Sequence, residues 1–396
     1  MNFPKGYKAC GLNCGIKKEK MDLAVVVSDV PAAAAGVYTT NLFQAAPLVV
    51  TKENIESNGQ AQAIVVNSGI ANAAMGKQGI EDAKACAKAL TDTFGLAEGD
   101  AIVASTGVIG MPIPVDKIAG GIEAAKAQVL PLEESVEAIS RAIMTTDTVP
   151  KTASAELVVD GTTVHFWGMC KGAGMIHPNM STMLGFVLCD AAIKSDLLQK
   201  ALSAAIGDSF NMISVDGDTS TNDMVTVLAN GMAENAVIDD EASDTFVGFK
   251  KVLKDICVDL AKQIVTDGEG ATKMFEVKVV QAPSVACAKT IARAVTCSSL
   301  VKAAMYGRDA NWGRIACAAG YSGAAFDPDK MDIFIGDLMV AQNGQGLAFD
   351  EEKALEILTE NNIDVLIDLH SGDDTAVAWG CDLTHDYVTI NADYRS

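Results

Sequence analysis

The sequence predicts an α/β (α+β) fold, because short apolar runs typical of buried strands alternate with segments of helical periodicity. Uncharged apolar runs at 23–27 and 63–66 are typical of buried strands. Over 244–265, apolar residues recur every three or four positions, which predicts one long amphipathic helix. Apolar residues make up 49% of the 396 positions, which is enough for one large α/β unit or for two or three domains.

The first half of the chain alternates strand and helix patterns. Pro31 is expected to end the first strand, because proline cannot donate a backbone hydrogen bond. Gly95 is expected to cap the C-terminal end of a helix. Asp160-Gly161 has the sequence of a two-residue turn, which predicts a hairpin over 156–167. The expected strands lie at 23–27, 63–66 and 101–104, and the expected helices at 80–94, 116–129 and 133–144.

The second half continues the alternation. The uncharged run at 183–189 is too short for most helices and predicts a buried strand. Ser195 is expected to cap the next helix. The terminal segment 379–396 is patterned like a strand that leads to Asn391, which favours docking into a site over a frayed tail. Further strands are expected at 275–279, 333–335 and 363–369, and helices at 244–265, 284–296 and 351–360.

Composition argues against several classes of partner. The 51 acidic and 30 basic residues give a formal charge of −21, which disfavours nucleic acid and anionic membranes but not small anionic substrates. The longest uncharged stretch, at 31–51, contains proline, glycine and polar residues, so no membrane span is expected. The first residues lack an apolar leader, which favours a cytoplasmic protein.

Neither a metal nor a cofactor is expected. The ten cysteines contain no C-x-x-C pair and lie among apolar residues, which predicts buried, reduced thiols. The four histidines lack the i,i+4 spacing of a ligand pair. The Asp-rich segment 214–223 has no glutamate at the twelfth position of an EF-hand, so it is interpreted as a structural, hydrogen-bonded loop. No distinctive coenzyme motif is visible.

The most informative stretch is residues 171–184, with the sequence KGAGMIHPNMSTML. Thr182 begins an apolar run after a glycine-rich loop, where a self-cleaving N-terminal nucleophile would lie. Its hydroxyl can attack the preceding carbonyl, and hydrolysis of the resulting ester would free its α-amine. That amine, with a reference pKa of roughly 7.7–8.0, can act as the general base for the same hydroxyl. On these residues alone, an ordinary strand threonine remains the alternative.

This stretch resembles the self-cleavage motif of the glutamate N-acetyltransferase (ornithine acetyltransferase) family of arginine biosynthesis. The family pattern is K-G-x-G-M-I-x-P-N-M-A-T-M-L, and Ser181 stands where alanine is usual. Similar blocks extend from about residue 6 to the end of the chain. The resemblance implies sheets sandwiched between helices. It also implies cleavage between Ser181 and Thr182 into an α chain of residues 1–181 and a β chain of residues 182–396, which stay associated as an α2β2 assembly.

The resemblance also implies roles for individual residues. Thr106 and Gly107 match the family's oxyanion hole, although on sequence alone they fit an ordinary turn after a strand. Both substrates of the family carry an α-carboxylate, which Lys171 is expected to bind, whereas Glu269 is expected to meet an amino group. The segment 307–314 carries two arginines, for which subunit packing is favoured over substrate binding. The positions that match substrate-binding residues are Thr145, Lys171, Thr182, Glu269, Asn391 and Ser396.

The implied activity is acetyl transfer from N2-acetyl-L-ornithine to L-glutamate through an acetyl-threonine ester. Whether acetyl-CoA also serves as a donor is left open, because members of the family differ. The alternative is a self-processed amidase or aminopeptidase, which would use the same nucleophile but release the acyl group to water. A catalytically silent binding protein would instead keep an intact chain.

Overall fold

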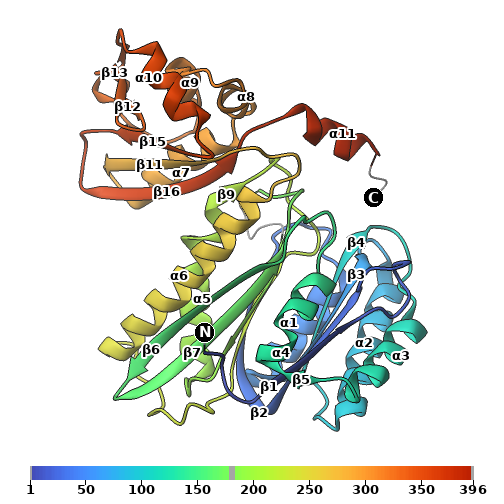
Figure 1. Ribbon diagram of the computed structural model, residues 1–396. Coiled ribbons are helices and arrows are strands. Elements are labelled where there is room, and N and C mark those ends of the chain that lie inside the picture. Colours follow the sequence, from blue (N-terminus) through green and yellow to red (C-terminus); the bar gives the residue numbers. More distant parts are fainter. Residues whose placement is uncertain (1, 178–182, 394–396) are drawn as a thin grey trace.

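The structure is a computed structural model that describes residues 2–177 and 183–393 (Figure 1). It contains two β-sheets with helices packed against them, so the predicted α/β class is confirmed. The described elements include eleven α-helices. They are α1 (Ala46–Asn58), α2 (Gly76–Phe94), α3 (Val115–Lys126), α4 (Leu132–Ala142), α5 (Ser195–Gly207), α6 (Asp244–Thr266), α7 (Val285–Cys297), α8 (Ser299–Gly307), α9 (Trp312–Gly320), α10 (Glu351–Thr359) and α11 (His385–Asp393).

The first sheet has the strand order β4-β3-β2-β10-β8-β7-β6, and β1 pairs with both β2 and β5. Strand β10 runs parallel to β8 and antiparallel to β2, whereas β7 runs antiparallel to β8. The strands are β1 (Tyr7–Leu12), β2 (Leu23–Tyr38), β3 (Gln60–Ile70), β4 (Ala101–Val108), β5 (Leu130–Pro131), β6 (Lys151–Val159), β7 (Thr162–Lys171), β8 (Leu184–Cys189) and β10 (Met224–Ala229).

The second sheet lies in the upper body of Figure 1 and has the order β14-β13-β12-β15-β11-β16-β9. Strands β11 and β15 are parallel, and β16 pairs antiparallel with β11. The strands are β9 (Ile213–Ser214), β11 (Met274–Ala282), β12 (Asp332–Ile335), β13 (Leu338–Gln342), β14 (Gln345–Gly346), β15 (Asn362–Asp368) and β16 (Asp374–Cys381). Short 3-10 helices lie at Phe210–Met212 and Pro328–Lys330.

Both faces of the first sheet are buried, as its uninterrupted apolar runs predict. On β3, Ile64 and Val66 join one apolar cluster, whereas Ala63 and Val65 point the other way into a second cluster. Helix α4 contributes to the first cluster, and α2 and α3 contribute to the second. Alternate side chains of one strand therefore hold helices on opposite faces.

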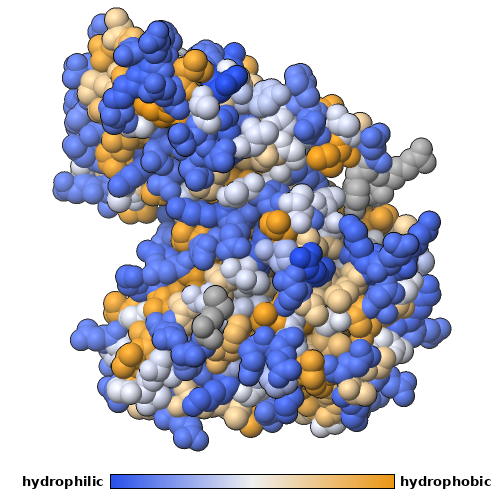
Figure 2. Space-filling view, viewed as in Figure 1, coloured by the Kyte–Doolittle hydropathy of each residue, from blue (hydrophilic) through white to orange (hydrophobic). Residues whose placement is uncertain are grey.

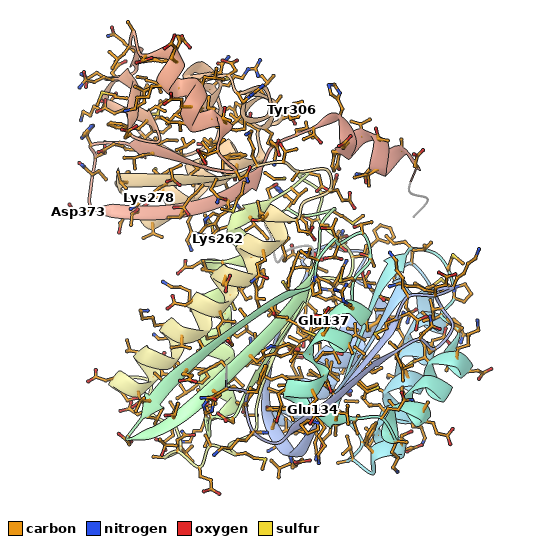
Figure 3. All side chains as sticks on the ribbon, viewed as in Figure 1. Glu134, Glu137, Lys262, Lys278, Tyr306 and Asp373 are labelled. Carbon is orange, nitrogen blue, oxygen red and sulfur yellow. The ribbon has the colours of Figure 1, made fainter. Side chains whose placement is uncertain are left out.

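Helix α6 connects the two sheets. It packs against β6 and β7 of the first sheet and against β9 and β16 of the second. Lys262 lies near the C-terminal end of this helix (Figure 3). Its Nζ pairs with Glu276 of β11 at 3.1 Å and lies 5.1 Å from the ring centre of Trp379. Hydrophilic residues cover most of the surface seen in Figure 2, in keeping with the high charge of the chain.

Pro31 does not end the first strand as expected, because β2 continues to Tyr38. The pairing of β2 with β3 shifts register between Val27 and Ala32. Pro31 lies within this shift, where a backbone N–H would have no hydrogen-bond partner on β3, so its lack of an N–H does not weaken the sheet. Ser195 is not the helix cap that the sequence suggested. Lys194 holds that position, and its side chain makes no capping bond.

The terminal segment is a helix, not the expected strand. Strand β16 ends at Cys381, and α11 follows. Thr384 accepts a hydrogen bond at Oγ1 from the N–H of Tyr387 at 3.3 Å, which is the geometry of a helix start. Val388 is 64% exposed, so the apolar pattern of the tail does not reflect burial in a sheet.

All ten cysteines are in the described residues and are free, but they are not all buried as expected. Cys317 is exposed, and Cys14 and Cys297 are half-buried. Within the described ranges, no helix has the length and apolar character needed to cross a bilayer.

Candidate active site

One pocket of about 180 Å³ gathers every described residue that the sequence assigned to the site. Thr182, Ser181 and Ser396 lie outside the described residues. Met183, the neighbour of Thr182 in the chain, lines the pocket. The six assigned residues that line it are Thr106, Gly107, Thr145, Lys171, Glu269 and Asn391.

Thr106 and Gly107 lie near the end of β4, beside the parallel strand β3. Gly107 has φ +130°, a conformation that side chains disfavour. A Cβ there would lie 2.2 Å from the carbonyl carbon of Gly69, so the two backbones could not approach so closely with any other residue. The close approach fixes the course of the backbone in this part of the pocket wall.

Lys171 brings a buried cation to the pocket. It is the last residue of β7 and only 8% exposed. Its Nζ donates to Oγ1 of Thr106 at 3.3 Å. Burial lowers the pKa of Lys171, while the nearby carboxylate of Asp147 opposes that change. The positive charge of Lys171 is therefore stabilised by acidic neighbours or by an anionic ligand.

A buried ion network lies behind the pocket wall. Lys151 Nζ is 2.8 Å from Asp147 Oδ1 and 2.5 Å from Asp267 Oδ2, and its side chain is fully buried. Asp147 also accepts from the backbone N–H of Thr145 at 3.0 Å and of Gly172 at 2.6 Å. The network therefore joins the segments that carry Thr145, Lys171 and Glu269.

Glu269 is held between the segment that contains Ala173 and the terminal helix α11. Its N–H donates to the carbonyl of Ala173 at 2.9 Å, and its Oε2 accepts from Asn391 Nδ2 at 2.8 Å. A Cβ on Gly174 would lie 2.3 Å from that same Oε2. A glycine in the motif thus leaves room for the glutamate side chain.

Sequence reasoning missed the pocket contribution of residues 220–223. Their Asp-rich segment was interpreted as a structural loop, yet Ser220, Thr221, Asn222 and Asp223 all line the pocket. The run of hydroxyl, amide and carboxylate groups directly before β10 was the signal available. Asn222 does serve the structure, because its Nδ2 donates to the carbonyls of Ala71 and Ser105.

Asp216, from the same segment, holds the described part of the stretch 171–184 in place. It accepts from the N–H of Ile176 at 2.8 Å and from the hydroxyl of Tyr387 in α11 at 3.2 Å. Burial raises the pKa of Asp216. Within residues 2–177 and 183–393, no cluster of three or more His, Cys, Asp or Glu side chains could hold a metal ion.

Together, the α/β fold and a pocket with a buried cation and carboxylates define an enzyme class that acts on small charged molecules. The chain belongs to the ArgJ family, whose model matches residues 8–396. The expected family is thereby confirmed.

Individual relatives match over nearly their whole length. The arginine biosynthesis bifunctional protein ArgJ of Symbiobacterium thermophilum is 51% identical over 396 residues, covering 99% of this chain and 98% of that protein. The protein of the same name from Thermotoga neapolitana is 47% identical over 401 residues, covering 100% of both chains. A crystal structure of ArgJ from Bacillus halodurans is 50% identical with a TM-score of 0.52, covering 54% of this chain and 100% of that one.

Proposed function

We propose that this chain transfers the acetyl group of N2-acetyl-L-ornithine to L-glutamate, giving L-ornithine and N-acetyl-L-glutamate in arginine biosynthesis. The observation that carries the proposal is the meeting of Thr106, Gly107, Thr145, Lys171, Glu269 and Asn391 in one pocket. Relatives that match over their full length and are named as arginine biosynthesis proteins support transfer over the alternative of hydrolysis.

In the proposed ping-pong reaction, the Thr182 hydroxyl attacks the acetamide carbon while its freed α-amine takes the proton. The Thr106 hydroxyl and the Gly107 N–H stabilise the oxyanion, and each such donor typically lowers the barrier by about 2.7–4 kcal/mol. The C–N bond then breaks, ornithine leaves, and an acetyl-threonine ester remains. The amine of glutamate attacks that ester by the reverse path.

Charge complementarity supports the assignment of substrate groups. Lys171 binds the α-carboxylate that donor and acceptor share, and Glu269 binds an amino group. The partly desolvated position of Lys171 favours an anionic ligand, because burial alone lowers the pKa of its ammonium group. Thr145, Asn391 and the terminal Ser396 complete the proposed substrate contacts.

Two observations support cleavage before Thr182 with the fragments remaining together. The solved Bacillus halodurans chain covers 54% of this chain, close to the share that residues 182–396 make up. Strands β8 and β10, which follow the cleavage point, lie between β2 and β7, which precede it. Separating the two fragments would break the backbone hydrogen bonds between β10 and β2 and those between β8 and β7.

Thr182→Ala tests the nucleophile. The wild type should run on a denaturing gel as fragments of 181 and 215 residues, whereas the variant should run as one band and lack activity. Ser181→Ala is the matched control, because it restores the usual family residue and should cleave and remain active. Two fragments from the Thr182→Ala protein would refute the assignment.

The fate of labelled acetyl separates the proposed transfer from hydrolysis. Transfer places the label on glutamate without free acetate, whereas an amidase releases acetate. The relatives are named bifunctional, and we assign the second activity to glutamate acetylation from acetyl-CoA. Replacing acetylornithine with acetyl-CoA in the same assay tests that assignment. We also propose an α2β2 assembly in the cytoplasm.

A further inference from the structure

Asp223 is a buried carboxyl group in the pocket that no motif assigned. It directly precedes β10, is 2% exposed, and lines the pocket. Its Oδ2 is buried without a hydrogen-bond partner in the part of the chain that the structure describes. A buried polar oxygen without a partner is costly and uncommon, so a ligand group that pairs with it would remove the penalty.

The backbone around Asp223 is firmly held, so its position is not that of a loose loop. The carbonyl of Asp223 accepts from the N–H of Thr39 at 3.0 Å. The next residue, Met224, donates from its N–H to the carbonyl of Met183 at 3.0 Å and pairs in register with Leu184. The carboxyl group is thereby fixed beside the start of β8, at the pocket wall.

The surroundings of the carboxyl group suit proton transfer. Burial raises the pKa of Asp223 well above its usual range, while the charge of Lys171 opposes this change. The N–H of Met183 and the hydroxyls of Thr39 and Ser220 also favour the ionised form, more weakly. A cationic group that entered the pocket would shift the balance further toward the carboxylate.

The proposed reaction needs such a group. The amide nitrogen of acetylornithine must gain two protons to leave as an ammonium group, and the Thr182 hydroxyl supplies only one. The ammonium group of glutamate must lose two protons to become an amide, and the Thr182 oxygen takes back only one. An acid that gives a proton in the first half-reaction and receives one in the second balances the cycle without drawing on solvent.

We propose that Asp223 is a further catalytic residue, which takes a proton from the ammonium group of incoming glutamate and returns one to the departing amine of ornithine. This inference rests on the proposed acetyl transfer. In the second half-reaction the N–H bond of glutamate breaks, a proton joins the carboxylate, and the freed lone pair attacks the ester carbon. Glu269 is less suited, because its Oε2 already accepts from Asn391 at 2.8 Å.

Asp223→Asn tests the role, because it keeps the shape of the side chain and removes proton transfer. The acetyl-enzyme formed from labelled acetylornithine is mixed with glutamate or with hydroxylamine, which is already uncharged at neutral pH and needs no base. Deacylation by glutamate should fall by about 10²-fold or more. Deacylation by hydroxylamine should stay within a few-fold of the wild type. Equal losses with both acceptors, or no loss with glutamate, would overturn the proposal.

Asp332→Asn is the control for removing a buried carboxylate elsewhere. Asp332 is 6% exposed, lies in β12 of the second sheet and is 2.9 Å from His370. This variant should retain both deacylation rates.

A second measurement uses the unaltered enzyme, so that poor cleavage or folding of a variant cannot hide the answer. At saturating glutamate, the deacylation rate should fall as acid protonates Asp223, whereas the hydroxylamine rate, expressed per uncharged hydroxylamine, should lack that ionisation. Matching pH profiles for the two acceptors would overturn the proposal. A wild type that never acetylates itself from acetylornithine would instead contradict the proposed function.

Discussion

Asn391 in α11 donates from Nδ2 to Oε2 of Glu269 at 2.8 Å, across 122 positions of the chain. The same helix reaches Asp216 through the hydroxyl of Tyr387 at 3.2 Å. Both contacts join the last described helix to loops that border the pocket. Helix α11 therefore completes a wall of the site even though none of its residues is buried.

Asn391→Ala should lower kcat/KM for acetylornithine by roughly tenfold, because it removes a hydrogen bond to a carboxylate at a partly exposed position. Steady-state kinetics measure the effect. Glu269→Gln should reduce the same parameter. Because the two side chains act together, the double variant should lose less than the product of the single effects. Val388→Ala, on the exposed part of the same helix, is the control and should behave as wild type.

The sequence predicted the order of strands and helices better than the residues at which they begin and end. Apolar runs located β3, β4 and β8 because these strands are buried on both faces, and Gly95 does end α2 with φ +70°. The helical nature of α11 was missed because its residues make no buried apolar face that periodicity could reveal. The prediction that Pro31 ends the strand was wrong, because the proline lies at a register shift where it disrupts no hydrogen bond between strands.

Residues that line the pocket could be proposed from the sequence where a motif contains them, but not where only tertiary contacts bring them together. The resemblance proposed the glycine-flanked Glu269, which lines the pocket. Lys151 lies only four positions from Asp147, but Asp267 comes from a distant segment, so only folding brings the three charges together. Asp223 was visible in an acidic segment, but its missing hydrogen bond exists only in three dimensions.

Lys151→Met should destabilise the protein by about 3–5 kcal/mol, because it leaves the carboxylates of Asp147 and Asp267 without their buried cation. Denaturant unfolding measures the change. Adding Asp147→Asn to this variant should recover part of the lost stability, since it removes one of the two buried carboxylates that no longer have Lys151 as a partner. Lys88→Met is the matched control at an exposed pair with Asp92, where a change of at most about 1 kcal/mol is expected. Equal effects of the two lysine substitutions would contradict the role of the network.

Acid should destabilise the folded protein by protonating Asp147. Burial alone would raise the pKa of Asp147, but the charges of Lys171 and Lys151 outweigh burial and lower it to about 2. A carboxyl group whose pKa is lower in the folded state stabilises the fold above its unfolded pKa of roughly 3.9. That stabilisation, on the order of 2 kcal/mol, is lost as the pH falls from about 4 to about 2.

Asp147→Asn isolates this contribution. Unfolding free energies of the wild type and the variant should converge as the pH falls through that window, because protonation removes the charge that the substitution removes permanently. Other acidic groups act equally in both proteins and cancel in the difference. Asp208→Asn, at a partly exposed pair with Lys289, is the control and should preserve the wild-type slope. A difference between wild type and Asp147→Asn that stays constant from about pH 5 to about pH 2 would show that Asp147 does not titrate in this range.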